Sequence, residues 1–165
     1  MRAWWRIGST RPSRRPPGVH VYIAKNGARA VVAALAVNGD GVYLEQPALA
    51  RRLDPPEAAA LGEAFIAAWD AFREDAPSAA GARRSAWPAL EASGARSAKA
   101  FEADYLRIEC FACNASGAIV RASAAHPVED GIDLSIAFNP RSHATEIGTA
   151  LLRLFAVARG NAAGS

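Results

Sequence analysis

The predicted order of elements occurs twice along the chain, and this repeat is the feature that most restricts the possible folds. Each half predicts a β-hairpin, a further strand and a helix, and a connector separates the halves. The two helices share a local pattern, Leu61-Gly62-Glu63-Ala64-Phe65 and Ile147-Gly148-Thr149-Ala150-Leu151. Two amphipathic helices and several hairpins favour an antiparallel sheet, or two abutting sheets, with both helices on one face. We therefore predict an α+β fold built from two similar hairpin-strand-helix halves.

The first half begins with a strong hairpin signal. Residues 18–25 place valine and isoleucine on one face, and the Asn26-Gly27 turn that follows tolerates positive φ at both positions. The return run, 28–37, is nearly all apolar, and its valines and flanking turns favour a central strand buried on both faces. Asn38-Gly39-Asp40-Gly41 predicts a second turn that leads into a short strand, Val42 to Glu45.

The first helix has a clear predicted start. Asp54 can cap the free amides, Pro55 suits the first helical position, and Glu57 completes a capping-box pattern. Gly62 lies beside the apolar stripe, where a missing side chain would let the helix approach the sheet closely, and Pro77 ends the helix. The stripe itself is formed by Leu61, Phe65, Trp69 and Phe72.

The second half repeats this order after a connector rich in Ala, Ser, Gly and Arg, residues 76–98, in which Trp87 is predicted to pack on the body. An alternating strand, Tyr105 to Cys113, is followed by a return strand, Ala118 to Ala124. A one-sided strand and a closing helix complete it, with inward residues Ile132, Leu134, Ile136, Phe138, Ile147, Leu151, Leu154 and Phe155. We predict a single domain over residues 1–165, with halves at 1–75 and 99–160.

The residue types that carry chemistry do not form a recognisable set. Cys110 and Cys113 have the spacing of a zinc or redox pair, but on an alternating strand that spacing puts the thiols on opposite faces. His20, His126 and His143 lie in three different elements, and neither a nucleophile elbow nor a phosphate-binding glycine loop occurs. We therefore predict no catalytic residues, no metal and no cofactor, and expect a binding protein rather than an enzyme.

Charge is distributed unevenly. The chain carries a formal net charge of +3, yet no acid precedes Asp40, whereas seven basic residues do. This basic N-terminal half predicts either a solvated arm and hairpin or, as the alternative function, a nucleic-acid-binding module. No apolar run reaches membrane-spanning length, the N-terminus lacks a signal-peptide core, and two cysteines suit a reducing compartment. We expect a cytoplasmic protein without a membrane partner.

Acidic residues gather around the start of the second half and its last turn. Two readings stay open for them, an ordinary solvated surface and an acidic surface that docks a basic partner. The candidate partner-binding residues are Glu102, Asp104, Glu129, Asp130 and Asp133.

The segment Gly41-Val42-Tyr43-Leu44-Glu45-Gln46-Pro47, followed by Leu53-Asp54 and by Leu61-Gly62-Glu63-Ala64-Phe65, resembles the immunity proteins of contact-dependent growth inhibition systems. The likeness covers about residues 40–72, and the pattern at residues 147–151 adds to it. The resemblance implies a small cytosolic protein that binds and neutralises the C-terminal toxin domain, often a nuclease, of a cognate CdiA-type effector. Acids on the inhibitor would complement a basic toxin channel, although the positive net charge departs from a simple nucleic-acid mimic.

Overall fold

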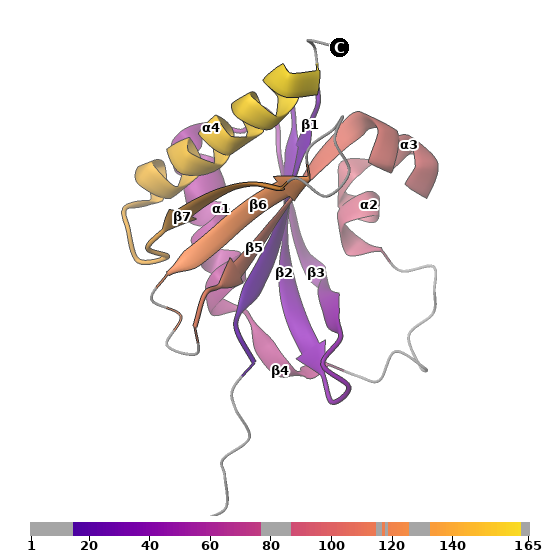
Figure 1. Cartoon of the computed structure of the whole chain (residues 1–165). Helices are drawn as coiled ribbons and strands as arrows, with labels where there is room; N and C mark the ends of the chain where they lie inside the picture. Colours follow the sequence, from indigo (N-terminus) through magenta and orange to yellow (C-terminus); the bar gives the residue numbers. More distant parts are fainter. Residues whose placement is uncertain (1–14, 77–86, 115–116, 118, 126–132, 163–165) are drawn as a thin grey trace, which may run out of the picture.

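One sheet of seven strands forms the centre of the computed structural model, which describes residues 15–76, 87–114, 117, 119–125 and 133–162. Six strands follow the order β3-β2-β1-β5-β6-β7 with antiparallel neighbours, and β4 pairs with β2 in parallel (Figure 1). The elements are β1 (Gly18–Ala24), β2 (Ala30–Asn38), β3 (Tyr43–Leu53), α1 (Ala58–Asp70), β4 (Arg73–Ala76), α2 (Pro88–Ser93), α3 (Ala98–Asp104), β5 (Tyr105–Ala112), β6 (Val120–Ala125), β7 (Asp133–Phe138) and α4 (Ala144–Ala162).

The two halves of the sequence meet at the middle of the sheet. β1 pairs with β5, with Val21 opposite Ile108, and each half then continues outward through its second and third strands. The helices that close the halves, α1 and α4, pack side by side on one face, which we call the inner face. The predicted fold class is therefore confirmed. The expectation of a single domain stays a prediction.

The inner face holds the main core. β2 is buried along its whole length, as predicted for a central strand, while β5 alternates between buried and more exposed residues. Leu61 and Phe65 from α1 meet Ile147 and Leu151 from α4 over the sheet, and all four are fully buried. Burial of each such side chain stabilises the fold by about 1.5–3 kcal/mol, so the helices persist because they cover the sheet.

The two glycines of the repeated helix pattern contact the opposite helix, which corrects the predicted approach of helix to sheet. A Cβ at Gly62 would overlap the backbone carbonyl of Ala144, the first residue of α4. A Cβ at Gly148 would overlap the backbone carbonyl of Ala58, the first residue of α1. The contact is reciprocal because the two halves are arranged alike, and the backbones touch only because both positions lack a side chain.

The predicted helix start at Asp54 is wrong. α1 begins at Ala58 with Glu57 in the capping position, and no side chain caps it. The Asp54 carboxylate instead accepts a hydrogen bond from Arg52 at 2.8 Å and lies 3.5 Å from Arg29. These guanidinium groups form charge-assisted contacts with the carboxylate, which therefore does not cap α1. β3 also extends to Leu53, directly before Asp54.

The short strand predicted at Val42 to Glu45 is also corrected, because β3 continues to Leu53. Its register with β2 shifts between Ala33 and Leu35, so two paired stretches flank an irregular stretch that contains Pro47. The buried amide of Gln46 donates to the carbonyl oxygens of Leu35 and Ala71, each at 2.8 Å. This side chain thereby satisfies backbone acceptors where the strand pairing is interrupted.

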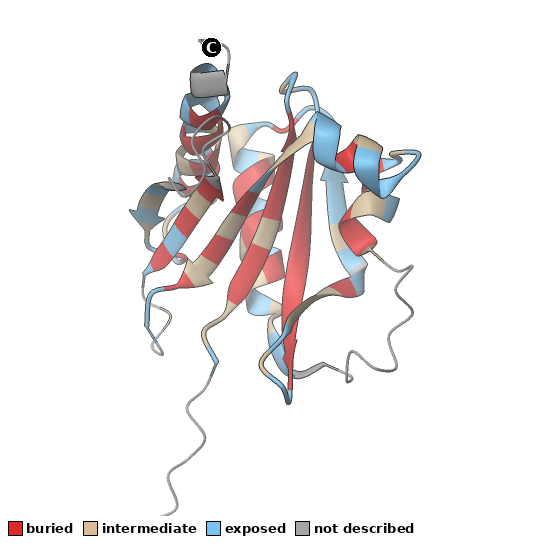
Figure 2. Ribbon diagram, turned by 45° about the vertical axis from the view of Figure 1, so that its right-hand side comes forward, coloured by how far each residue is buried: buried red, intermediate tan, exposed pale blue. Residues whose placement is uncertain are grey.

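Several elements were not predicted, most of them on the other side of the sheet, the outer face. α1 ends at Asp70 rather than beyond Phe72, and β4 follows it; Pro77 lies outside the described residues. Within the predicted connector and just after it, α2 and α3 pack over β1, β2 and β3 (Figure 2). No helix among the described residues is both long and apolar enough to cross a membrane.

Candidate functional site

The structure describes the side chains of only two of the five predicted acidic residues, Glu102 and Asp104. Glu102 and Asp104 are exposed at the C-terminal end of α3, and we call this pair the acidic end. Glu129 and Asp130 lie outside the described residues, as does the side chain of Asp133. The backbone of Asp133 pairs with Ala125 at the end of β6, so β7 starts at the same end of the sheet as β5. The partner-binding role of these five residues stays a prediction.

Apart from Tyr105 at the start of β5, which packs on Phe101 of α3, the outer side chains of β5, β6 and β7 carry no described helix over them, unlike those of β1 to β3 (Figure 2). We call this surface the open outer face. Arg107 and Glu109 form an ion pair of 2.7 Å on it and are about half exposed. The register places the following residues on the same face: Arg107, Glu109, Phe111, Arg121, Ser123, Ser135 and Ala137. This surface is therefore mixed in charge rather than uniformly acidic.

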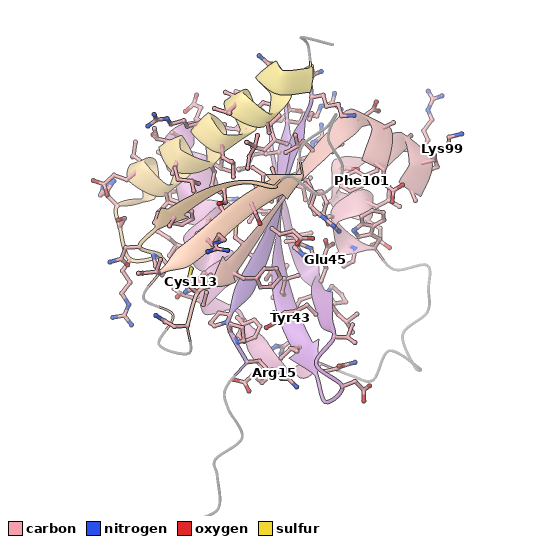
Figure 3. The ribbon with its side chains drawn as sticks, viewed as in Figure 1. Arg15, Tyr43, Glu45, Lys99, Phe101 and Cys113 are labelled. Carbon is pink, nitrogen blue, oxygen red and sulfur yellow. The ribbon has the colours of Figure 1, made fainter. Side chains whose placement is uncertain are left out.

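Glu45 lies on β3, in the covered part of the outer face, and its side chain reaches residues of β1. Its Oε1 accepts hydrogen bonds from the Tyr22 hydroxyl at 2.6 Å and from Trp87 Nε1 at 3.3 Å, and it lies 3.2 Å from His20 Nδ1. Its Oε2 accepts from the backbone N–H of Ala89 at 2.9 Å. We call these five residues the Glu45 cluster. One carboxylate thus joins β1, β3 and the start of α2 (Figure 3).

The electrostatics of the cluster follow from burial and hydrogen bonding acting in opposite directions. The Glu45 side chain is only 6% exposed, and this burial raises the pKa of the carboxyl group. Hydrogen bonds from His20, Tyr22 and the Ala89 amide outweigh the burial, so the pKa of Glu45 is lower than usual. Burial, and secondly the Glu45 charge, raise the pKa of Tyr22. Glu45 is therefore ionised at neutral pH and Tyr22 is a hydrogen-bond donor.

His20 faces the open outer face from within this cluster. Its ring lies edge-on to Phe111, and among the described residues its hydrogen-bond partners are Tyr22 and Glu45. A carboxylate beside a histidine can orient the ring for proton transfer, yet the same pair also serves to anchor strands. The contacts of Glu45 with His20, Tyr22, Trp87 and Ala89 connect β3 and the start of α2 to β1.

An aromatic pocket of about 240 Å³ lies next to the Glu45 cluster. Phe101 is the centre of its rings, with ring centroids 4.9 Å from Tyr22, 5.0 Å from Trp87 and 4.7 Å from Tyr105. Phe101 and Tyr22 are buried and form the base, whereas Trp87 and Tyr105 are half-buried and form the walls. The residues that line the pocket are Tyr22, Trp87, Phe101, Glu102, Tyr105 and Arg107.

Local sequence explains how α2 and α3 hold these rings. Pro88 occupies the start of α2, and Gly94 ends it in the left-handed region with φ of 73°. The hydroxyl oxygen of Ser97 accepts a hydrogen bond from the backbone N–H of Ala100 at 3.2 Å and so caps α3. Trp87 and Phe101 thereby project from two short helices onto the same part of the sheet, and Trp87 attaches the connector to the body as predicted.

The other predicted candidates are dispersed. Cys110 is buried in the inner core, where burial raises the pKa of its thiol, and Cys113 is exposed just beyond the end of β5. His143 precedes α4, and His126 lies outside the described residues. In the described part of the chain, no group of three or more His, Cys, Asp or Glu residues is arranged to hold a metal ion.

The cations of the predicted nucleic-acid alternative do not form one patch in the described residues. Arg15 lies before β1, whereas Lys25 and Arg29 lie at the hairpin turn that follows it. A seven-residue strand separates them, which spans roughly 23 Å. Arg29 is also within 3.5 Å of the Asp54 carboxylate. Arg2, Arg6, Arg11 and Arg14 lie outside the described residues, and the nucleic-acid reading stays a hypothesis.

Comparison with known proteins gives a fold likeness. No family model and no curated protein matches the chain. A solved structure of a protein of unknown function from Neisseria meningitidis superposes with a TM-score of 0.57 at 12% sequence identity, covering 88% of this chain and 96% of that one. At this identity the likeness concerns the fold. The two chains share an α+β architecture over nearly their whole lengths.

Proposed function

We propose that the protein acts in the cytosol by binding another protein, as a stoichiometric inhibitor of a toxin domain. This is the immunity function that the sequence resemblance implies. The observation that supports it best is the open outer face, where side chains of both charges are presented on a rigid sheet beside the acidic end. Sites held by a regular sheet and its helices keep their geometry, which favours protein recognition.

The partner in this proposal is the C-terminal toxin domain of a CdiA-type effector, and the contact lies at the acidic end and the adjoining part of the open outer face. A partner with a basic channel complements Glu102 and Asp104, and such charges act mainly on encounter rate and partner choice. The net charge of +3 does not oppose this reading, because complementarity is decided by the charges at the contact.

Stoichiometry tests the proposal directly. Increasing amounts of the purified protein are added to a fixed amount of the cognate CdiA-type toxin domain, and residual toxin activity is measured. We expect activity to fall linearly and reach its minimum near equimolar protein, because each toxin domain is occluded by one inhibitor. Continued inactivation by substoichiometric protein would indicate turnover, and unchanged toxin activity at excess protein would contradict the immunity function.

The acidic end gives a second expectation. Reversing both charges in Glu102→Lys/Asp104→Lys should slow association with the toxin domain by roughly 10-fold at low salt, with a much smaller effect at high salt. Stopped-flow association across a salt series measures this. The matched control is Glu63→Lys on α1, an exposed acid on the opposite side of the sheet. Equal rates and equal salt dependence for both variants would place the contact elsewhere.

A further inference from the structure

The aromatic pocket has the composition of a site for a positively charged group. Four rings line it, and Glu102 stands at its rim. Aromatic faces carry partial negative charge and attract cations placed over them, an effect strongest for tryptophan and tyrosine. We propose that this pocket receives one arginine side chain of the partner protein. The inference rests on the proposed function, because it names the chemical group that the same surface recognises.

Hydrogen bonds to Glu45 make two rings of the pocket, those of Tyr22 and Trp87, better suited to bind a cation. Tyr22 and Trp87 both direct their polar hydrogens to Glu45, at 2.6 and 3.3 Å, so these donors are already occupied. A ring whose O–H or N–H donates to a carboxylate becomes richer in electrons, which strengthens its attraction for a cation. The pocket therefore offers electron-rich ring surface rather than free hydrogen-bond donors.

The charges around the pocket also favour a cation. Glu102 lines it and Glu45 lies behind two of its rings, whereas Arg107 is the only cation among the described lining residues. The Arg107 guanidinium is 2.7 Å from Glu109, so its charge is largely compensated. Lys99 of α3 extends outward from the helix, away from Phe101 (Figure 3). The surroundings thus complement a positive guest and disfavour an anion.

Arginine fits this arrangement better than other cationic side chains. Its planar guanidinium stacks on aromatic rings and can donate two parallel hydrogen bonds to a carboxylate. Trp87 and Tyr105 provide half-buried ring surface, and Glu102 provides the carboxylate at the rim. A volume of about 240 Å³ accommodates a guanidinium with part of its aliphatic stem. Arginine and aromatic residues are also the groups that dominate binding energy at protein interfaces.

A small probe tests the pocket without the toxin. N-acetyl-arginine amide is titrated into the full chain, and the resonances of the Trp87 indole and the Phe101 and Tyr105 rings are followed by NMR. We expect saturable shifts at these rings with a dissociation constant on the order of 1–10 mM. The citrulline analogue has nearly the same shape without the charge, and it should bind at least ~5-fold more weakly. Equal binding of both probes, or no saturable shift, would overturn the proposal.

Three variants test which side chains of the pocket bind the arginine probe. Glu102→Gln should weaken arginine binding roughly 3- to 10-fold, and Tyr105→Leu should also weaken it because one wall loses its ring. Arg107→Gln should leave binding unchanged or strengthen it by roughly 2-fold, since it removes a competing charge. The matched control, Glu63→Gln on α1, should bind as the wild type does. Loss of binding in Arg107→Gln with retention in Glu102→Gln would contradict recognition of a cation by Glu102 and overturn the proposal.

Measurements of toxin binding and neutralisation by the same variants distinguish failure of this inference from failure of the proposed function. Neutralisation of the toxin with wild-type affinity by Glu102→Gln and Tyr105→Leu would overturn the arginine pocket and leave the inhibitor function standing. Saturable binding of the arginine probe without any binding of the toxin would overturn the immunity function and leave a cation pocket. The complete proposal requires that both variants weaken toxin binding in parallel with probe binding.

Discussion

Replacing Gly62 or Gly148 by alanine is expected to lower the free energy of unfolding by about 3 kcal/mol. In both cases the added Cβ overlaps a backbone carbonyl of the opposite helix, and backbone cannot rotate away as a side chain can. α1 and α4 would have to separate, and the core contacts between Leu61, Phe65 and Leu151 would loosen with them. Urea unfolding followed by circular dichroism measures the loss.

The same helix supplies the control. A methyl group added at Gly160 in α4 would meet no atom within 4 Å, so Gly160→Ala should be neutral or stabilise by up to about 1 kcal/mol through helix propensity. The double variant Gly62→Ala/Gly148→Ala should lose less than the sum of the single variants, because one separation of the helices relieves both overlaps. Unchanged stability in both single variants would show that α1 and α4 do not pack as described.

Glu45→Gln is expected to lower the free energy of unfolding by about 3 kcal/mol at neutral pH. Both carboxylate oxygens of Glu45 accept hydrogen bonds, Oε1 from Tyr22 and Trp87 and Oε2 from the Ala89 amide. An amide side chain has one acceptor oxygen and an NH₂ group that only donates, so this NH₂ group must face a donor on one side of the cluster. A buried donor is then left without a partner. Denaturant unfolding of the two proteins measures the difference.

The pH dependence of this difference identifies its cause. The pKa of Glu45 is below its usual value in the folded protein, so its contribution is present above the unfolded pKa of about 4.3. As pH falls from there toward the folded pKa, the wild type should lose its advantage over Glu45→Gln by up to about 1.4 kcal/mol per pH unit. Glu63→Gln, an exposed control, should stay within about 0.5 kcal/mol of wild type. A difference that stays constant as pH falls well below 4 would contradict an ionised, hydrogen-bonded Glu45.

Apart from Glu102, the residues of the Glu45 cluster and the aromatic pocket were not predicted as site residues, although several had a local signal. Glu45 is an acid within a strand, and His20 and Tyr22 alternate onto the outer face of another. Nothing local connects them to Trp87, since 42 residues separate Trp87 from Glu45. The acid joins them because α2 folds back over β3, and a contact of that sequence separation depends on the packing of the whole chain.

Other errors arose where tertiary contacts overrode a local preference. Asp54 has the right position to cap a helix, but its carboxylate binds Arg52, two residues earlier on β3, and lies near Arg29 of the β1–β2 turn. Pro47 argues against a long strand, yet β3 continues past it because the irregular register and the Gln46 side chain satisfy the backbone there. In each case part of the competing contact comes from a distant residue, Arg29 for Asp54 and Leu35 and Ala71 for Gln46, so the local pattern did not contain it.

Local sequence patterns were sufficient to predict the repeated order of elements, the buried central strand, the inner faces of β5 and β7, and the two closing helices, because hydrophobic periodicity and turn residues act over a few positions. Packing of the complete chain established which helix each glycine contacts, which strands keep an open outer face, and which side chains meet at Glu45 and Phe101. These features depend on how separately formed elements pack together. Their physical basis is steric fit and hydrogen-bond satisfaction between residues far apart in the chain.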